Sequence, residues 1–159
     1  MRICFLIIIL SCYQSQVTAQ STSSAQVNPC KEKLIRVEKD SKYGFMNEQQ
    51  VVVIPIKYDY ASEFRGCLSE VELAGKRGWI SKKGEVVVPI IYEYTWEFKE
   101  GMAMVKKDDK IGWIDTTGKV VIPIQYDGAQ DFVRGTASVM KDEKQYTINR
   151  KGECVRDCE

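Results

Sequence analysis

Two stretches of the sequence follow nearly the same pattern: GWISKKGEVVVPIIYEY at residues 78–94 and GWIDTTGKVVIPIQYDG at residues 112–128. The step of 34 residues between them recurs along the chain. It separates equivalent residues of four kinds: Gly44, Gly78 and Gly112; Pro55, Pro89 and Pro123; Tyr58, Tyr92 and Tyr126; Phe64, Phe98 and Phe132. Self-similarity at a fixed period indicates a repeated structural unit.

Incomplete copies flank these units. LIRVEKDSKYGF at 34–45 aligns with MAMVKKDDKIGW at 102–113, and YTINRKGECVRDC at 146–158 aligns with GWIDTTGKVVIPI at 112–124. The chain from residue 34 to 159 therefore divides into a half repeat (34–41), three repeats (42–75, 76–109 and 110–143) and a degenerate capping repeat (144–159).

The residue types within each unit predict strands. A 34-residue period is also typical of helical tetratricopeptide units, but runs such as KVVIP at 119–123 are β-branched and end in proline, which opposes a helix. We expect three short antiparallel strands per unit, at 112–115, 120–123 and 136–140 in the third repeat, with Pro123 ending the second. Gly118 suits the left-handed position of the hairpin turn, where the first repeat has Gln50 instead.

The most regular apolar positions predict the core. Valine recurs on the third strand and an aromatic residue at the start of the first, and the set is Val37, Val71, Val105, Val139, Phe45, Trp79 and Trp113. One such unit cannot bury its apolar face alone, whereas stacked neighbours can. The predicted fold is therefore all-β, an open array of tandem 34-residue repeats; the units are too few and too small to close a propeller.

The residues of these units resemble the WG repeat, also called the KWG repeat, a family common in bacterial proteins. The Gly-Trp pair, the hairpin glycine, the Val-Val-Ile/Val-Pro run, the Tyr-Asp/Glu pair and the Phe-x-x-Gly element stand in register over about residues 34–158. Cys67 interrupts the last element, because it stands where Gly101 and Gly135 stand in the other units. The resemblance implies an exported β-repeat array that serves as a binding or scaffold module, with no common enzymatic activity.

The first residues predict export. Arg2, the apolar run ICFLIIIL and the small residues before Ala19 form a signal peptide over residues 1–19, with cleavage after Ala19. The apolar run is too short for a transmembrane span. The alternative is a bacterial lipoprotein acylated at Cys12, because ILSC resembles a lipobox. Residues 20–33, rich in serine and glutamine at their start, predict a flexible linker.

Charge and histidine content exclude several classes of protein. The chain has 23 basic and 22 acidic residues, and loss of Arg2 with the signal peptide would leave 22 of each, so a nucleic-acid binder is not expected. Lysine pairs such as Lys82-Lys83 then indicate solvated hairpin tips. The absence of histidine removes the usual general base and metal ligand. We expect no catalytic residue, no metal ligand and no cofactor.

Pairs of carboxylates recur in every repeat. They are Asp59 with Glu63, Glu93 with Glu97, and Asp127 with Asp131. Such pairs serve glycoside hydrolases and calcium sites. An active site is normally made once, however, whereas this pair is made three times, so a structural role is preferred. Asp59 and Asp127 are placed to cap a single helical turn.

Four cysteines remain after residue 19: Cys30, Cys67, Cys154 and Cys158. An even number in an exported chain predicts disulfides, with three possible connectivities. We favour Cys30–Cys67, which ties the linker to the first full repeat, with Cys154–Cys158. The second pair requires the chain to curl at Asp157, because in an extended strand these cysteines would lie about 13 Å apart.

Function is expected where the repeats differ from one another. Trp96 aligns with Ser62 and Gln130, and Tyr94 aligns with Tyr60 and Gly128. Tyr60, Tyr94 and Trp96 are therefore candidate contacts for a protein partner. Two alternatives stay open, a carbohydrate-binding module that uses Tyr94 and Trp96 on an envelope glycan, and a hydrolase that uses one acidic pair. Trp96 could instead pack over its own loop.

Overall fold

A computed structural model describes residues 29–158 of the chain. The expected signal peptide with Ala19, the alternative lipid site at Cys12 and most of the expected linker lie outside the described residues. The described part contains fifteen strands and one short 3₁₀ turn, η1 (Pro29–Lys31), so the all-β prediction is confirmed.

The strands form four antiparallel sheets that follow one another along the chain. The first contains β1 (Ile35–Lys39), β2 (Lys42–Met46) and β3 (Val52–Tyr58). The second contains β4 (Tyr60–Ala61), β5 (Leu68–Leu73), β6 (Lys76–Ser81) and β7 (Val86–Tyr92). The third contains β8 (Tyr94–Thr95), β9 (Met102–Lys107), β10 (Lys110–Asp115) and β11 (Val120–Tyr126). The fourth contains β12 (Gly128–Ala129), β13 (Thr136–Lys141), β14 (Lys144–Asn149) and β15 (Cys154–Arg156).

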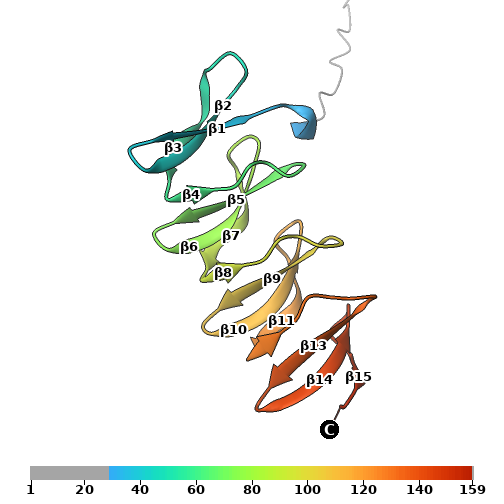
Figure 1. Cartoon of the computed structure of the whole chain (residues 1–159). Helices are drawn as coiled ribbons and strands as arrows, with labels where there is room; N and C mark the ends of the chain where they lie inside the picture. Colours follow the sequence, from blue (N-terminus) through green and yellow to red (C-terminus); the bar gives the residue numbers. More distant parts are fainter. Residues whose placement is uncertain (1–28, 159) are drawn as a thin grey trace, which may run out of the picture.

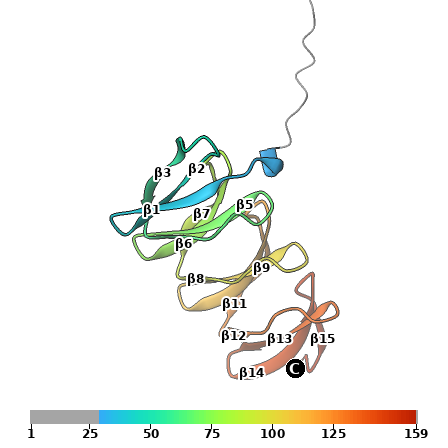
Figure 2. The same cartoon turned by 45° about the horizontal axis from the view of Figure 1, so that its top comes forward.

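The four sheets stack one after another along the molecule, in chain order from the first to the fourth (Figure 1). The first and fourth sheets lie at opposite ends in both views, so the array is open (Figures 1 and 2). Sheet boundaries and repeat boundaries do not coincide. The repeat at 42–75, for example, gives β2 and β3 to the first sheet and β4 and β5 to the second. Each complete repeat therefore links two neighbouring sheets covalently.

The hydrophobic core lies between the sheets, in three separate clusters. One cluster joins Phe45 and Ile54 of the first sheet to Val71 and Ile80 of the second. The next joins the second and third sheets, and its buried members are Trp79, Val88, Tyr92, Ala103, Val105 and Ile114. The last joins the third and fourth sheets, and its buried members are Met104, Ile111, Trp113, Ile122, Tyr126, Ala137, Val139 and Ile148. Each sheet therefore covers the apolar face of its neighbour, as stacking of incomplete units requires.

Each buried aromatic residue of the Gly-Trp position also has an aromatic partner from the next sheet. The ring centroids of Phe45 and Phe64 lie 4.6 Å apart. The corresponding distances are 5.0 Å for Trp79 and Phe98, and 5.3 Å for Trp113 and Phe132. The tilted or edge-to-face geometry of these pairs is the favourable one for aromatic rings.

The second strand of each unit is longer than the sequence predicts. Pro123 does not end it, because β11 continues through the proline to Tyr126. The pairing of β10 with β11 shifts register between Ile111 and Trp113 and again before Ile114, which marks an irregular ladder. β11 is also an edge strand, and a proline without an N–H group is tolerated at a bulge of an edge strand. The segment after it adds a strand of two residues, β12, so three of the sheets have four strands.

The ends of the array differ from its middle. Val37 is only half-buried, whereas Val71, Val105 and Val139 are buried. Val37 lies in the first sheet, which has no earlier sheet of the described chain to cover it. Leu34, just before β1, is buried in the first cluster instead.

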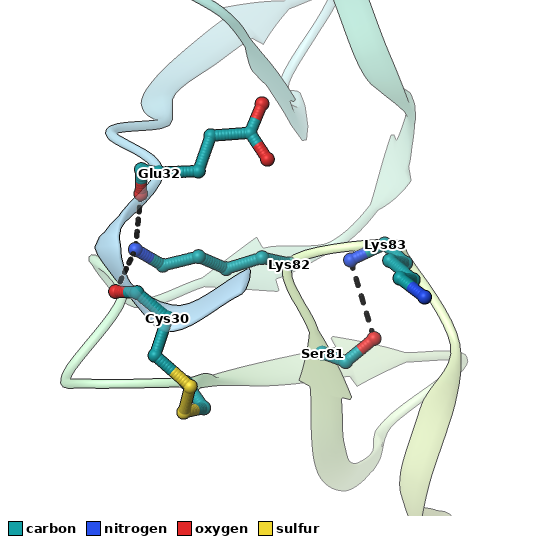
Figure 3. Close-up of a disulfide and its surroundings, with 6 residues drawn as sticks. Cys30, Glu32, Ser81, Lys82 and Lys83 are labelled. Carbon is teal, nitrogen blue, oxygen red and sulfur yellow. Dashed lines mark hydrogen bonds between the residues drawn. A yellow bond between two sulfur atoms is a disulfide. The ribbon is translucent and has the colours of Figure 1, made fainter. Parts of the chain in front are cut away.

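The N-terminal segment is fastened to the second sheet. A disulfide joins Cys30 to Cys67, with 4.5 Å between their Cα atoms. The Lys82 ammonium group donates to the carbonyl oxygens of Glu32 and Cys30, the latter at 2.8 Å (Figure 3). The interpretation of Lys82-Lys83 as solvated is therefore wrong for Lys82, which is half-buried; Lys83 is exposed. Residues 29–33, the end of the expected linker, contain η1 and these contacts.

The C-terminal segment closes with the second disulfide. Cys154 and Cys158 are bonded, and their Cα atoms lie 5.7 Å apart. Asp157 has a positive φ of 55°, so the chain curls at this residue and brings the two cysteines together. This curl lets a sequence separation of only four residues be bridged.

Candidate functional site

Two of the candidate aromatic residues lie exposed on short edge strands. Tyr60 of β4 is 39% exposed and Tyr94 of β8 is 48% exposed. Arg77 of β6 lies between them. Its guanidinium carbon is 5.9 Å from the ring centroid of Tyr60 and 5.2 Å from that of Tyr94. We call these three residues the tyrosine–arginine row.

Two carboxylates hold Arg77 in this position. Its Nε atom donates to Glu72 at 3.0 Å, and its Nη1 atom donates to Glu70 at 3.3 Å. The same Oε1 atom of Glu70 accepts from the hydroxyl of Thr95, at 2.5 Å, across to the third sheet. The register also pairs Tyr60 with Glu72 and Glu72 with Arg77. The guanidinium group is therefore held in one orientation by two carboxylates of the same sheet.

Trp96 packs into the array rather than standing on the surface. Its ring lies 4.7 Å from that of Tyr94, edge to face. The side chain is partly buried against the cluster that contains Met104 and Trp113. The structure thus joins Trp96 to Tyr94 directly, and joins Tyr60 to Tyr94 only through Arg77. The local-packing alternative accounts for the contact of Trp96 with Tyr94, whereas its packing against the cluster extends beyond its own loop.

A pocket of about 600 Å³ opens between the second and third sheets. Its apolar walls are Tyr60, Leu68, Trp79, Val87 and Phe98, together with the disulfide-bonded Cys67. Its polar lining residues are Ser62, Arg65, Glu70, Ser81, Glu97 and Thr116. Volumes of about 300–1,000 Å³ with aromatic walls and a few polar groups are typical of small-ligand pockets. The Glu70 side chain, 17% exposed, joins the pocket to the tyrosine–arginine row because it also holds Arg77.

The first carboxylate of each acidic pair stabilises a hairpin turn. Asp59 accepts the backbone N–H of Ala74 at 2.7 Å, and the ammonium group of Lys42. Asp127 accepts the N–H of Asp142 at 2.9 Å. These turns join antiparallel strands and have positive φ at both central residues, 52° and 72° at Ala74 and Gly75. The expected helical turn is therefore wrong, because the acids cap β-turns fifteen residues further along the chain.

These contacts favour the ionised carboxylate. The Lys42 ammonium group, and then the Ala74 N–H, hold the pKa of Asp59 below its ordinary value. Lys110 and the Asp142 N–H lower the pKa of Asp127 in the same way. The backbone N–H of Asp109 lowers the pKa of Glu93. A general acid in glycoside hydrolysis needs a raised pKa, which is the opposite direction.

The second carboxylate of each pair connects neighbouring units. Glu63 lies 3.5 Å from the Nε atom of Arg36, and Glu97 lies 2.5 Å from Nη1 of Arg65. Asp131 pairs with Lys99. Both members of each acidic pair thus have partners within the protein.

Within residues 29–158, His, Cys, Asp and Glu side chains do not gather in a group of three or more that could hold a metal ion. The same residues contain no helix that is long and apolar enough to cross a membrane.

Sequence reasoning missed Arg77 and the pocket. A signal for both was present in the repeat alignment. Arg77 stands where the first and third repeats have Tyr43 and Ile111, and Glu70 stands where the second repeat has Met104. The sequence interpretation rested on aromatic, cysteine and glycine positions that differ between repeats, and it gave no weight to charged residues at variable positions such as Glu70 and Arg77.

Comparison with known proteins identifies the repeat. The family model described as WG containing repeat matches residues 43–76, 78–110 and 111–144, which together make up more than half of the chain. No curated protein and no solved structure matches the chain. The three matches coincide with the units that supply the glycine-aromatic pairs and the bulged strands described above. The chain therefore belongs to the WG containing repeat family.

Proposed function

We propose that this protein is an exported, non-enzymatic binding module that recognises a protein partner through the tyrosine–arginine row. The observation that carries the proposal is the position of Arg77, held by Glu70 and Glu72 between the exposed rings of Tyr60 and Tyr94. Tyrosine and arginine are among the residues most enriched in the energetic centres of protein interfaces.

Rigidity of the row supports this function. The cost of ordering a side chain on binding is about 0.5–1.5 kcal/mol. Arg77 is already ordered by its two carboxylates, so much of this cost is met in the free protein. The tyrosine–arginine row also spans the second and third sheets, so a partner that covered it would contact both of these sheets.

The non-enzymatic part of the proposal is supported by the acidic pairs. Each carboxylate that would have to act as acid or nucleophile accepts a backbone N–H group or pairs with a basic side chain. The chain also lacks histidine. A hydrolase using one of these pairs would have to break a contact that the repeat makes in every copy.

Export is proposed from the sequence of residues 1–19 together with the two disulfides. Disulfides persist in oxidising compartments outside the cytoplasm. Cleavage after Ala19 would release residues 20–159, whereas acylation at Cys12 would anchor the protein to a membrane surface. Mass spectrometry of the mature protein separates these two outcomes.

A carbohydrate-binding module is the second candidate. Tyr94 offers an exposed ring, and Trp96 contacts it. The two rings meet at an interplanar angle of 63°, however, so they do not form one flat platform for a sugar. A protein partner is therefore preferred over an envelope glycan.

The test compares the native protein with Arg77→Ala and with the double variant Tyr60→Ser/Tyr94→Ser. Each is used as bait for proteins of the secreted and envelope fractions, and each is applied to a glycan array. We expect at least one protein to be retained by the native chain and lost at least tenfold with both variants. Lys83→Ala, at an exposed hairpin tip, is the matched control and should retain it. Binding of glycans alone would refute the proposal.

A further inference from the structure

The pocket between the second and third sheets coincides with a missing aromatic side chain. Ser62, Trp96 and Gln130 occupy the same backbone position in successive units. Their backbone N–H groups donate to the backbone carbonyl oxygens of Glu70, Met104 and Ser138, at 2.8, 3.0 and 2.9 Å respectively. The backbone is therefore equivalent at the three sites, and only the side chain differs. Where the second unit has an indole, the first has a hydroxymethyl group.

The apolar walls of the pocket, Cys67 apart, are the repeat equivalents of residues in and around the cluster against which Trp96 packs. Trp96 lies 4.7 Å from the ring of Tyr94 and packs against the cluster of Trp113. Met102, Val121 and Phe132 are packed against the same cluster. One repeat earlier, the equivalent residues all line the pocket, and they are Tyr60, Leu68, Trp79, Val87 and Phe98. The chain thus shows, in its own next repeat, which group fits such a site.

We propose that the pocket binds an indole ring, presented as a tryptophan side chain by the protein partner. The source of the ring rests on the proposed function; the affinity of the pocket for indole does not. The apolar walls supply the aromatic contacts that Trp96 makes in the next unit. The pocket volume of about 600 Å³ leaves room for the backbone that carries the ring.

The polar lining favours indole over a purely apolar ring. Indole N–H is a donor without acceptor capacity, so a buried indole needs an acceptor. Glu70 lines the pocket where the next unit has Met104. Its carboxylate already accepts from Arg77 and Thr95, and a carboxylate has further lone pairs for another donor. A phenylalanine side chain would leave that capacity unused.

A protein source fits the position of the pocket. Tyr60 belongs both to the pocket wall and to the tyrosine–arginine row. Glu70 lines the pocket and also holds Arg77. A polypeptide whose tryptophan entered the pocket would therefore place its flanking residues against the tyrosine–arginine row. The pocket and the row would then form one continuous binding surface.

The first experiment titrates the ¹⁵N-labelled protein with N-acetyl-tryptophanamide and follows amide shifts by NMR. We expect one site per chain, with shifts centred on Leu68, Trp79 and Phe98. N-acetyl-phenylalaninamide should bind at least tenfold more weakly. Ser62→Trp fills the pocket as Trp96 fills the next one, and should weaken binding at least tenfold. Gln130→Trp makes the same change at the equivalent exposed position and should leave binding unchanged.

The reverse substitution tests the same idea by gain of a site. Trp96→Ser should open an equivalent space between the third and fourth sheets. A second set of shifts, near Met102 and Phe132, should then appear, and the number of bound ligands should rise from one to two. This variant keeps the proposal testable if Ser62→Trp does not fold. Absence of binding to the native protein, or equal binding by Ser62→Trp, would overturn it.

The outcomes separate this inference from the proposed function. If the native chain retains a protein through Arg77 but does not bind N-acetyl-tryptophanamide, the inference is wrong and the function stands. If N-acetyl-tryptophanamide binds and Ser62→Trp still retains the partner, the partner does not use the pocket, and the tryptophan source is refuted. Free indole that binds tenfold more tightly than N-acetyl-tryptophanamide would likewise refute a side-chain source.

Discussion

Gly78 lies directly beneath the carbonyl oxygen of Val88, because a Cβ atom on Gly78 would stand 2.6 Å from that oxygen. The carbonyl oxygen of Pro89 would be 2.7 Å away. At Gly44 and Gly112 the nearest atoms, at 2.6 and 2.7 Å, are again backbone oxygens of the neighbouring strand. The glycine of the repeated Gly-Trp pair is therefore required by a strand that passes over it at the bulge.

Gly78→Ala should consequently destabilise the protein by about 3 kcal/mol, because backbone atoms must move to admit the new methyl group. Gly75→Ala is the matched control. Gly75 has a positive φ of 72° but open space around it, so only backbone strain of about 1 kcal/mol is expected. Urea unfolding of both variants makes the comparison, and equal destabilisation would show that space above Gly78 is not what matters.

The same geometry shows what the sequence could and could not reveal. The 34-residue step identifies the residues that are buried, since Phe45, Trp79 and Trp113 occupy one position of the unit. It does not reveal the bulge. Proline after a β-branched run indicates the end of a strand, but the edge position of β11 and its irregular pairing with β10 let the strand continue through Pro123. A pattern along the chain does not report the register between strands.

The sequence also did not predict which groups the polar side chains would contact. Asp59 binds the turn at Ala74, and Lys82 binds carbonyl oxygens about fifty residues earlier in the chain. Both contacts depend on which segments the folded repeat brings together. Charge and local spacing instead indicated a local cap for Asp59 and a solvated position for Lys82. The half-buried state of Val37 has a similar origin, because a repeat position does not say which unit is terminal.

Gln50→Gly should stabilise the protein by about 1 kcal/mol, because Gln50 has a positive φ of 61°. A side chain at the equivalent Gly118 is tolerated less well than at Gln50. A Cβ atom on Gly118 would lie 2.8 Å from the Val87 carbonyl oxygen of the preceding sheet. Gln50 belongs to the first sheet, where the described chain has no preceding sheet to meet. Gly118→Gln should therefore lower the unfolding temperature by more than Gln50→Gly raises it. Changes of equal size and opposite sign would contradict the close approach of Gly118 to the Val87 carbonyl oxygen.

Stability should fall at acid pH and change little near neutrality. The folded pKa values of Asp59, Asp115 and Asp127 are lowered by donors, chiefly Lys42, Thr117 and Lys110. A lowered carboxyl pKa contributes stability that is present above the unfolded value, about 3.9 for aspartate, and is lost as pH falls through the folded value. No histidine titrates in between. The free energy of unfolding should thus be nearly flat from about pH 5 to 8 and decrease below about pH 4.

The double variant Asp59→Asn/Asp127→Asn checks this assignment. It should reduce stability at neutral pH and flatten the acid decline, since the side chains no longer ionise. Glu48→Gln, on the exposed β2–β3 turn, is the control and should leave the profile unchanged. An acid decline as steep in the double variant as in the native chain would assign the pH dependence to other groups.

Loss of the Cys30–Cys67 disulfide should destabilise the first sheet more than loss of Cys154–Cys158 destabilises the fourth. The first bond closes a loop with a sequence separation of 37 and the second one of only 4. Chain entropy then gives contributions of about 4 and about 2 kcal/mol. Cys30→Ser/Cys67→Ser leaves the Lys82 contacts as the remaining fastening of the segment before β1. Hydrogen exchange should therefore show loss of protection in β1 and around Leu34, with the third and fourth sheets unchanged, because repeats contact only their neighbours. Uniform loss of protection across all four sheets would mean that the array unfolds as one cooperative unit.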